Sequence, residues 1–443
     1  MSSESSEAYD AVVIGMSVRK ADRSACAASL VCLLLPGGGI MGASATYALS
    51  KRGLKVAMLE RFHPTHRNGS SWGDGRIFRF AYVEPSKVKM AQISGDLYQE
   101  LERRTRMRVL NRIGQIDMAP IGHKELRGLV DTYDKGGIPY TRMTAAEVNK
   151  TFPQLHLTDR EEAIYQPDGG VTYADSARTA FFEAARQNGA TLLFSTVAKA
   201  IHRQPSGGFA VDLAAPDDPS PMRRRRIVCS KVVVTTGGWT NDVLKMVGLC
   251  TLPMRVTNEQ PMYFMPRDGE DVAAFEEGAM PVFIFRGFEK EYYGIPTVKG
   301  GECGVKVAVH QGCHDMMDTP EGRTKQENAQ FTADTQKWVR RFFPRLDECR
   351  YSAHRCLYQM TADREFIVGC HPECTDVIVA TGFCGEGFKF APWVGEACVQ
   401  LGFPERMAEA VKVPSEFTLS RFVPSHRTGS EGGGGHVYAQ SRL

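Results

Sequence analysis

The hydrophobic and polar positions near the start of the chain predict two strands with a helix between them. Residues 9–15 (YDAVVIG) form a short run of β-branched side chains ending in glycine, typical of a buried parallel strand. Residues 44–52 carry Ala, Leu and Lys at helical spacing, and residues 54–60 (LKVAMLE) predict a second strand that ends in an acidic residue. We therefore expect a strand–helix–strand unit here.

Elements of the same kind are predicted much further along the chain. The run VVVTTGGW ends in a glycine pair, and the apolar run DVIVATG leads into the glycine-rich turn GFCGEGFKF. Because such strands occur at both ends of the sequence, we expect a second domain to be inserted between them. Strands are expected over residues 191–195, 226–236 and 376–382, and helices over residues 175–188, 330–343 and around 395–401.

The helix near the N-terminus is preceded by a GxGxxG pattern made of Gly37, Gly39 and Gly42. Small residues let the backbone approach a pyrophosphate at a helix N-terminus, where free N–H groups and the helix dipole favour anions. Glu60 follows the last glycine by 18 residues, where it could accept hydrogen bonds from ribose hydroxyls. The pattern predicts a dinucleotide-binding site.

A segment of 22 residues, 16–37, separates the first predicted strand from most of this glycine pattern. A long excursion at that point would displace the N–H groups that a pyrophosphate needs. Residues 30–35 could replace residues 9–15 as the first strand. Alternatively, the segment is an unspliced intron, which we favour because LVCLLLP can be encoded almost wholly in pyrimidines and the flanks rejoin as VVIGGGIMG.

Length and charge narrow the class of protein. The 443 residues are too many for one ordinary core, so two domains are expected. A net charge of +3, from 54 Lys and Arg against 51 Asp and Glu, does not predict a nucleic-acid partner. We interpret the basic run Arg223 to Arg226 as a solvated loop.

The apolar runs and cysteines predict neither a membrane span nor a metal site. The longest apolar run, residues 25–35, is too short to span a bilayer, so we expect a soluble protein. The 12 cysteines lack paired CxxC spacing. Cys370, His371 and Cys374 are close in sequence but lack a second pair of ligands for zinc.

The last three residues, Ser441, Arg442 and Leu443, form a close variant of the serine-lysine-leucine peroxisomal address. The glycine-rich stretch 429–435 would present them on a flexible tail, which we expect over residues 418–443. A peroxisomal location and an import receptor as partner are therefore expected.

Six stretches resemble, in order and spacing, the monomeric sarcosine oxidase and pipecolate oxidase family of FAD-dependent amine oxidases. They are VVIG plus GGIMG with LERF, NGSSWGDGRIFRFAY (68–82), YYGIP (292–296), GGECGVKVAVH (300–310), HRCLYQMTADREFIVG (354–369) and GFCGEGFKFAP (382–392). The resemblance implies an α/β fold of two domains, a Rossmann-like FAD-binding domain with a spliced-in mixed β-sheet substrate domain, of the glutathione-reductase or D-amino-acid-oxidase type. The implied FAD-binding domain covers residues 8–112, 172–246 and 357–417, and the substrate domain covers residues 113–171 and 247–356.

The resemblance also implies how FAD is held. Cys356 matches the position at which the family links a cysteine sulfur to the flavin, and a thioether retains the cofactor and raises its potential. The alternative is a buried, inert thiol. The other residues implied to bind FAD are Gly37, Gly39, Gly42, Glu60, Arg61, Ser70, Gly385, Gly387 and Lys389.

Further matches imply catalytic and substrate-binding roles. Lys306 matches the lysine that faces the flavin and assists oxygen reduction, because a preorganised cation lowers the cost of forming superoxide. Arg79 and Lys389 match the cations that hold the substrate carboxylate. His310, Tyr293 and Arg76 match further active-site positions.

Two positions depart from the family pattern. Trp72 and Glu386 each stand where the family commonly has a histidine. A carboxylate at 386 could repel an acidic substrate or attract a second amino group, so we expect it to bias the pocket away from plain sarcosine.

The expected reaction is hydride transfer from the C–N bond of a secondary amino acid to flavin, with reoxidation by O2, giving an imine and hydrogen peroxide. A monomer is expected because relatives are commonly monomers. Two alternatives stay open: an amine dehydrogenase using another electron acceptor, and an inactive protein that binds no FAD because of segment 16–37.

Overall fold

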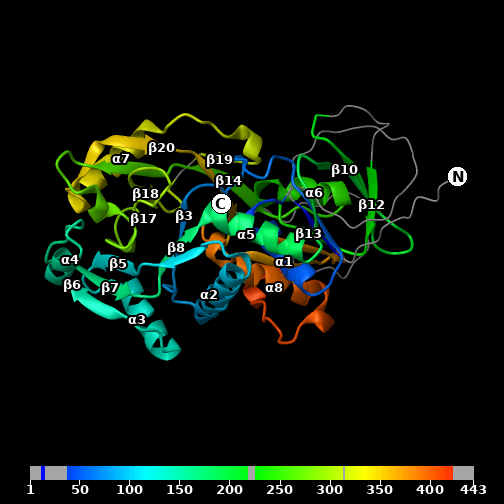
Figure 1. The fold of residues 1–443 in the computed structure, drawn as a ribbon, viewed down its shortest axis with the longest axis horizontal. Helices are drawn as coiled ribbons and strands as arrows, with labels where there is room; N and C mark the ends of the chain where they lie inside the picture. The colour runs from blue at the N-terminus through cyan, green and yellow to red at the C-terminus, as the bar shows by residue number, and fades with distance from the viewer. Residues whose placement is uncertain (1–10, 15–36, 218–224, 313–314, 423–443) are drawn as a thin grey trace.

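The computed structural model describes residues 11–14, 37–217, 225–312 and 315–422. Its two large sheets occupy the two halves of the molecule, with the eight-stranded sheet on the left in Figure 1 and the six-stranded sheet on the right. Among the described residues, no helix is long and apolar enough to cross a bilayer.

The six-stranded sheet has the order β22-β23-β13-β1-β2-β9. Neighbouring strands are parallel except for β22, which runs antiparallel to β23. The parallel strands β2, β13 and most of β23 are buried, as their unbroken apolar runs require. The strands are β1 (Ala11–Ile14), β2 (Val56–Leu59), β9 (Thr191–Leu193), β13 (Val232–Val234), β22 (Ile367–His371) and β23 (Cys374–Thr381).

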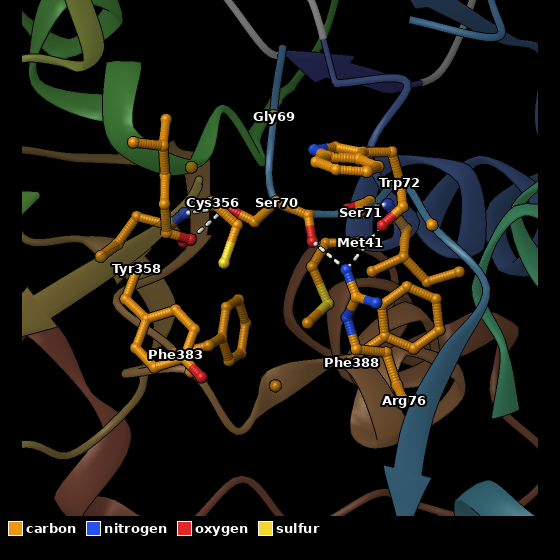
Figure 2. Close-up of a pocket in the computed structure, with 18 of the residues that line it drawn as sticks. Met41, Gly69, Ser70, Ser71, Trp72, Arg76, Cys356, Tyr358, Phe383 and Phe388 are labelled. Atoms are coloured by element: carbon orange, nitrogen blue, oxygen red, sulfur yellow. Dashed lines mark hydrogen bonds between the residues drawn. The ribbon is translucent and has the colours of Figure 1, made fainter. Parts of the chain in front are cut away.

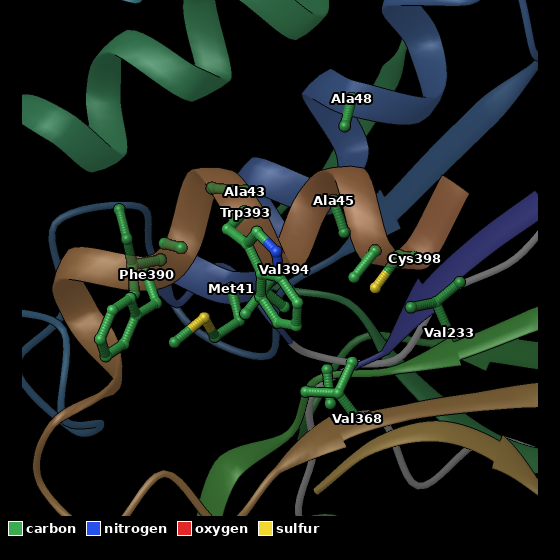
Figure 3. Close-up of a cluster of buried hydrophobic side chains, with 14 of the residues drawn as sticks. Met41, Ala43, Ala45, Ala48, Val233, Val368, Phe390, Trp393, Val394 and Cys398 are labelled. Atoms are coloured by element: carbon green, nitrogen blue, oxygen red, sulfur yellow. The ribbon is translucent and has the colours of Figure 1, made fainter. Parts of the chain in front are cut away.

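The helices packed on this sheet are α1 (Ile40–Lys51), α5 (Ala174–Gln187) and α8 (Ala391–Gly402), and α2 (Pro85–Thr105) packs against α8 and α5. Helix α1 is buried from Ile40 to Ser50, because it contacts both α8 and α5. Figure 3 shows Trp393 and Cys398 of α8 beside alanines of α1 and above the sheet strands. A Cβ on Gly395 would lie 2.6 Å from Ser44 Oγ, so only glycine permits this close approach of the two helices.

One predicted strand is in fact two. The run predicted as a single strand over residues 226–236 forms β12 (Arg225–Cys229) and β13, separated by Ser230 and Lys231. Strand β12 pairs antiparallel with β11 (Phe209–Ala214), which also pairs with β10 (Val197–Arg203), whereas β13 joins the parallel sheet. The single-strand prediction was wrong because β-branched residues occur in both segments, so the local sequence does not show where one strand ends. The two strands differ only in the strands with which they pair.

The eight-stranded sheet has the order β20-β15-β18-β17-β16-β5-β7-β6, and only β16 and β5 are parallel. Helix α7 (Ala329–Phe342) packs on it, with the Trp338 ring stacked on Tyr292 at 4.3 Å. The other helices of this half are α3 (Lys124–Gly136) and α4 (Ala145–Thr151). The strands are β5 (Gln115–Pro120), β6 (Thr141–Thr144), β7 (Glu161–Gln166), β15 (Met262–Pro266), β16 (Val282–Phe285), β17 (Tyr292–Ile295), β18 (Val305–Val309) and β20 (Leu346–Ala353).

Two small sheets complete the fold, and they carry segments that come from both parts of the expected domain division. One has the order β3-β8-β4 and the other β19-β14-β21. The expected boundaries at 171/172 and 356/357 fall inside β8 and β21, and the division stays a prediction. The elements are β3 (Gly75–Phe78), β4 (Leu110–Arg112), β8 (Gly170–Tyr173), β14 (Met254–Glu259), β19 (Met316–Met317), β21 (Cys356–Thr361), α6 (Thr240–Val247), and short 3-10 helices over 237–239, 272–275, 320–322, 387–390, 404–406, 415–417 and 419–422.

The structure excludes one of the two explanations for segment 16–37. Strand β1 pairs with β2 on one side and with β13 on the other, so the position of the first strand is filled by Ala11–Ile14. The prediction that residues 30–35 replace it was therefore wrong. Residues 15–36 lie outside the described part of the chain.

The described chain remains packed beyond the predicted start of the C-terminal tail. Leu419 is buried, and a short 3-10 helix runs over Leu419–Phe422 beside β22. The predicted start at residue 418 was therefore too early. The terminal residues Ser441 to Leu443 lie outside the described residues.

Candidate functional site

One cavity contains nearly all of the residues singled out from the sequence. Its lining runs from the glycine turn before α1, past the loop of residues 69–76, to the turn before α8. Gly42 is the one predicted site residue outside this lining. The predicted residues that line it are Gly37, Gly39, Glu60, Arg61, Ser70, Arg76, Arg79, Tyr293, Lys306, His310, Cys356, Gly385, Glu386, Gly387 and Lys389.

Gly42 acts on the cavity through packing. A Cβ on Gly42 would lie 1.9 Å from the carbonyl oxygen of Gly37, so no larger residue fits while the turn keeps this shape. Gly37 N–H in turn donates to Leu59 O at 2.9 Å, which fastens the turn to β2. The N-terminus of α1 is thereby held at the cavity wall, where it can face an anion.

Glu60 closes the same end of the cavity. Its carboxylate accepts hydrogen bonds from Gly38 N–H at 2.7 Å and Phe62 N–H at 2.8 Å, and His66 Nε2 lies 3.4 Å away. Each carboxylate oxygen can accept a further hydrogen bond, so the predicted contact with a ribose hydroxyl remains feasible. Arg61 lines the cavity next to Glu60.

The loop between β2 and β3 connects α1 to β21. Ser71 Oγ accepts a hydrogen bond from Ile40 N–H at 3.0 Å, and Ser70 Oγ donates to Leu357 O at 2.6 Å. Arg76 donates to the carbonyls of Ser70 and Trp72 at 3.0 and 2.7 Å. Figure 2 shows this loop crossing the pocket between Cys356 on one side and Arg76 on the other.

Lys306 and Cys356 form part of one wall, from β18 and β21. Lys306 is only 6% exposed, and burial together with the nearby charge of Arg76 lowers its pKa to about 7. Its ammonium contacts the Tyr263 ring at 5.9 Å but makes no hydrogen bond or ion pair to another described residue. Burial raises the pKa of the Cys356 thiol to about 11, while the charges of Lys306 and Arg76 oppose that rise.

Two tyrosines, Tyr293 and Tyr358, line the cavity together with this wall and with the charged residues Arg79 and Glu386. Tyr293 and Tyr358 share a hydrogen bond of 2.9 Å between their hydroxyls, and burial raises the pKa of both. A Cβ on Gly385 would lie 2.1 Å from the Tyr358 ring, and Gly385 has φ of +83°, so glycine is required there on both grounds.

A compact cluster of charged side chains occupies the far end. Arg79 Nη2 donates to Glu386 Oε1 at 2.5 Å, and His310 Nε2 lies 3.9 Å from the same oxygen. Burial would raise the pKa of Glu386, but the charges of Arg79, Lys389 and His310 lower it to about 2. Burial and Arg79 lower the pKa of Lys389 to about 7.

Behind this cluster lies a second buried ion pair. Arg286 Nε donates to Asp117 Oδ1 at 2.8 Å, and Arg286 Nη1 lies 3.8 Å from Glu291 Oε1. Burial raises the pKa of Asp117, while the charge of Arg286 opposes that rise. Glu291 lines the cavity and is a third carboxylate at this end.

Among the lining residues that sequence reasoning missed, three carry groups that bear on the chemistry of the cavity. Tyr358 follows Cys356 by two positions, so the alternation of a strand could have placed it on the same face. Arg178 is a cation on the alanine-rich buried face of α5, which is an unusual place for a charge. Glu291 has no local signal, because it reaches the cavity only through the pairing of β17 with its neighbours.

The residues present fit FAD. The glycine turn brings backbone to the cavity wall, and Arg178 lines the same cavity with its buried Nε lacking a hydrogen-bond partner. Arg178 also pairs with Asp175 through Nη2 at 3.2 Å, and a buried cation that keeps a free N–H in this cavity suits a diphosphate. Among the described residues, no group of three or more His, Cys, Asp or Glu side chains could hold a metal ion.

Comparisons with known proteins agree with this geometry. Residues 37–401 match the family described as FAD dependent oxidoreductase (DAO). Monomeric sarcosine oxidase from Arthrobacter sp. is 25% identical over 88% of this chain and 96% of its own length, and human peroxisomal sarcosine oxidase is 28% identical over 87% and 95%.

Solved structures share the fold. NikD, an unusual amino acid oxidase essential for nikkomycin biosynthesis, has a TM-score of 0.73 at 21% identity, covering 93% of this chain and 98% of its own. L-proline dehydrogenase from P. horikoshii has a TM-score of 0.71 at 20% identity, covering 91% and 95%. With the family match spanning most of the chain, the predicted α/β fold is confirmed, and this chain belongs to the FAD dependent oxidoreductase (DAO) family.

Proposed function

We propose that this protein is an FAD-dependent oxidase of a secondary amino acid of the sarcosine or L-pipecolate type. The amine and O2 are consumed, and an imine and hydrogen peroxide are formed. The observation that carries this proposal is that Cys356, Lys306 and Arg79, from three distant parts of the sequence, line one cavity that ends at the glycine turn.

The cofactor would be held at both of its ends. The turn at Gly37 and Gly39, with Glu60 and Arg178, would hold the dinucleotide part, and Cys356 would hold the flavin part through a thioether. The hydrogen bond from Ser70 to the carbonyl of Leu357 positions the strand that carries Cys356. Arg76 keeps the loop closed over the same region.

Bound FAD supplies the hydride acceptor for the C–N bond of the substrate. Arg79 and Lys389 provide cations for the substrate carboxylate, and the tyrosine pair Tyr293–Tyr358 gives the reacting end a wall with few exposed polar atoms. Lys306 places a cation, free of protein hydrogen bonds among the described residues, where reduced oxygen would form.

Lys306 also favours an oxidase over a dehydrogenase. A dehydrogenase that passes electrons to another acceptor has no need of a buried cation that makes no ion pair. The structural likeness to an L-proline dehydrogenase concerns the fold alone. Peroxide formation distinguishes the two functions.

The residues on either side of segment 16–37 argue against an inactive protein that binds no FAD. Strand β1 lies in the centre of the parallel sheet, and Gly37 is hydrogen-bonded to β2 as a dinucleotide turn requires. The unspliced-intron hypothesis remains a proposal, which sequencing of the mature transcript tests.

We further propose a peroxisomal location and a monomeric state. The C-terminal Ser-Arg-Leu tripeptide and the relatives named peroxisomal sarcosine oxidase support the location, and those named monomeric sarcosine oxidase support the state. An oxidase that makes hydrogen peroxide suits a compartment that removes it.

The direct test is the reductive half of the reaction. Purified protein should be yellow and should bleach when mixed anaerobically with sarcosine, L-pipecolate, L-proline or N-methyl amino acids. Absence of bound flavin, or a flavin that none of these amines bleaches, would overturn the proposal.

A further inference from the structure

The Arg79–Glu386 pair bears on which charged groups a substrate needs in order to bind in the cavity. Arg79 is 7% exposed, and its two terminal nitrogens are both engaged, Nη2 with Glu386 Oε1 and Nη1 with Ala81 O at 3.2 Å. The guanidinium also lies 4.4 Å from the Tyr82 ring centre. The expected carboxylate-binding arginine is therefore already paired with a carboxylate of the protein itself.

Glu386 keeps one oxygen available toward the cavity. Only Oε1 takes part in its ion pairs, and Oε2 has no hydrogen-bond partner among the described residues, while the side chain is 18% exposed. Lys389 donates to the main-chain carbonyl of Glu386 at 2.7 Å rather than to its side chain. Glu386 can therefore accept a new cation without any rearrangement of Lys389.

The charges around this end nearly cancel. Arg79 balances Glu386, and the buried Arg286 is shared by Asp117 and the partly exposed Glu125. What remains is Lys389 on one side and Glu291 on the other, with His310 held toward its neutral form because burial lowers its pKa. An amino acid whose reacting amine is neutral carries a charge of −1 and finds little net attraction here.

A substrate that carries only a carboxylate must compete with Glu386 for Arg79. If the substrate displaces Glu386, the buried Glu386 carboxylate is left without its cationic partner. A substrate that also carries a separate cation avoids this cost, since its carboxylate takes Arg79 while its cation takes Glu386. One internal ion pair is then exchanged for two pairs with the substrate, and the total charge of the site is conserved.

We propose that Glu386 is a specificity-determining residue that selects secondary amino acids with a second, protonated amino or guanidinium group. This inference rests on the proposed function and names its substrate class. The second cation binds Glu386, and the carboxylate binds Arg79 and Lys389.

The test uses two thioethers that match in shape and differ in one charge. In both, sulfur replaces the reacting nitrogen, so neither compound has a C–N bond at the position where the substrate would be oxidised. (2-Aminoethylthio)acetate carries the second cation, and (propylthio)acetate has a methyl group in its place. Their dissociation constants are measured on the FAD-loaded protein by calorimetry, which requires no turnover.

We expect the wild-type protein to bind the amino compound at least ten times more tightly. Glu386→Gln should abolish this preference by weakening the amino compound, while the propyl compound binds as well as before or better. Glu291→Gln, at the neighbouring carboxylate, should keep the preference.

Equal binding of the two compounds by the wild type overturns the inference, whatever the variants do. A preference that survives in Glu386→Gln, or one lost in Glu291→Gln alone, also overturns it. Failure of the proposed function is distinguishable, because then no secondary amine bleaches the flavin. Bleaching by amines together with equal thioether binding defeats only the inference drawn from Glu386.

Discussion

The hydroxyl of Ser70 donates a hydrogen bond of 2.6 Å to the carbonyl of Leu357, the residue next to Cys356. Residues 70 and 357 come from distant parts of the sequence, yet this contact joins the loop after β2 to the start of strand β21. Gln359 Nε2 donates to the same Ser70 oxygen at 3.1 Å. The strand that carries the cysteine is thus held at two points, Leu357 and Gln359, by the same serine.

The first prediction concerns that cysteine. Cys356→Ala should leave FAD bound through the glycine turn but release it to the supernatant when the protein is precipitated with acid. The wild-type protein should keep its yellow colour in the pellet, because a thioether survives unfolding. Cys349→Ala, at an exposed thiol, is the control and should behave as the wild type does. Flavin released equally from wild type and Cys356→Ala would show that no covalent bond forms there.

The second prediction concerns oxygen. Lys306→Met should slow reoxidation of the reduced flavin by about 10²-fold or more, the usual loss when one preorganised charge donor is removed. Bleaching by the amine should change much less. Stopped-flow mixing of reduced protein with O2 measures the first rate, and Lys299→Met, at an exposed lysine nearby, is the control. Equal reoxidation rates for wild type and Lys306→Met would remove Lys306 from the mechanism.

The same lysine predicts a pH dependence. Because burial lowers the pKa of Lys306 to about 7, the charged form is lost as the pH rises through 7. Reoxidation by the wild type should therefore slow as the pH rises from 6 to 8, whereas the slower reaction of Lys306→Met should stay flat. A wild-type rate that increases over this range contradicts the assignment.

The fourth prediction concerns the glycine turn. Gly42→Ala places a Cβ 1.9 Å from Gly37 O, so the turn must open, and we expect loss of bound FAD and a free-energy cost of about 1–3 kcal/mol. Gly136→Ala is the matched helical control, because its Cβ would meet nothing closer than 3.5 Å. That variant should keep FAD and gain at most about 1 kcal/mol. Flavin content and thermal unfolding measure both effects.

The fifth prediction concerns stability in acid. The folded-state pKa of Glu386 is lowered from 4.5 to about 2, so its ion pairs stabilise the fold fully above pH 4.5 and are lost as the pH falls toward 2. Glu386→Gln should be less stable than wild type by about 3 kcal/mol at pH 7, and the difference should shrink between pH 4.5 and 2. Urea unfolding at several pH values measures it, and a difference independent of pH would contradict this account.

The strongest sequence signals were local ones. The glycine turn and Glu60 could be predicted because a strand, a turn and a helix follow one another within one stretch of sequence. The strand over residues 376–382 could be predicted for the same reason, since a short apolar run is bounded by polar residues and glycine.

What the sequence could not supply was pairing between distant segments. Glu386 was recognised as unusual, but its ion pair with Arg79 depends on the approach of β3 to the turn before α8. The position of Glu291 in the cavity lining likewise depends on strand pairing between distant segments. The division of residues 226–236 into two strands also required the partner strands, because β-branched residues suit either sheet.

The most direct test of the proposed oxidase is the molar ratio of amine oxidised, O2 consumed and hydrogen peroxide formed. In air, each molecule of a secondary amino acid oxidised by the purified protein should consume one molecule of O2 and yield one of hydrogen peroxide, measured together with an oxygen electrode and a peroxidase assay. Amine oxidation that proceeds without oxygen uptake, or oxygen uptake without peroxide, would contradict the proposed oxidase.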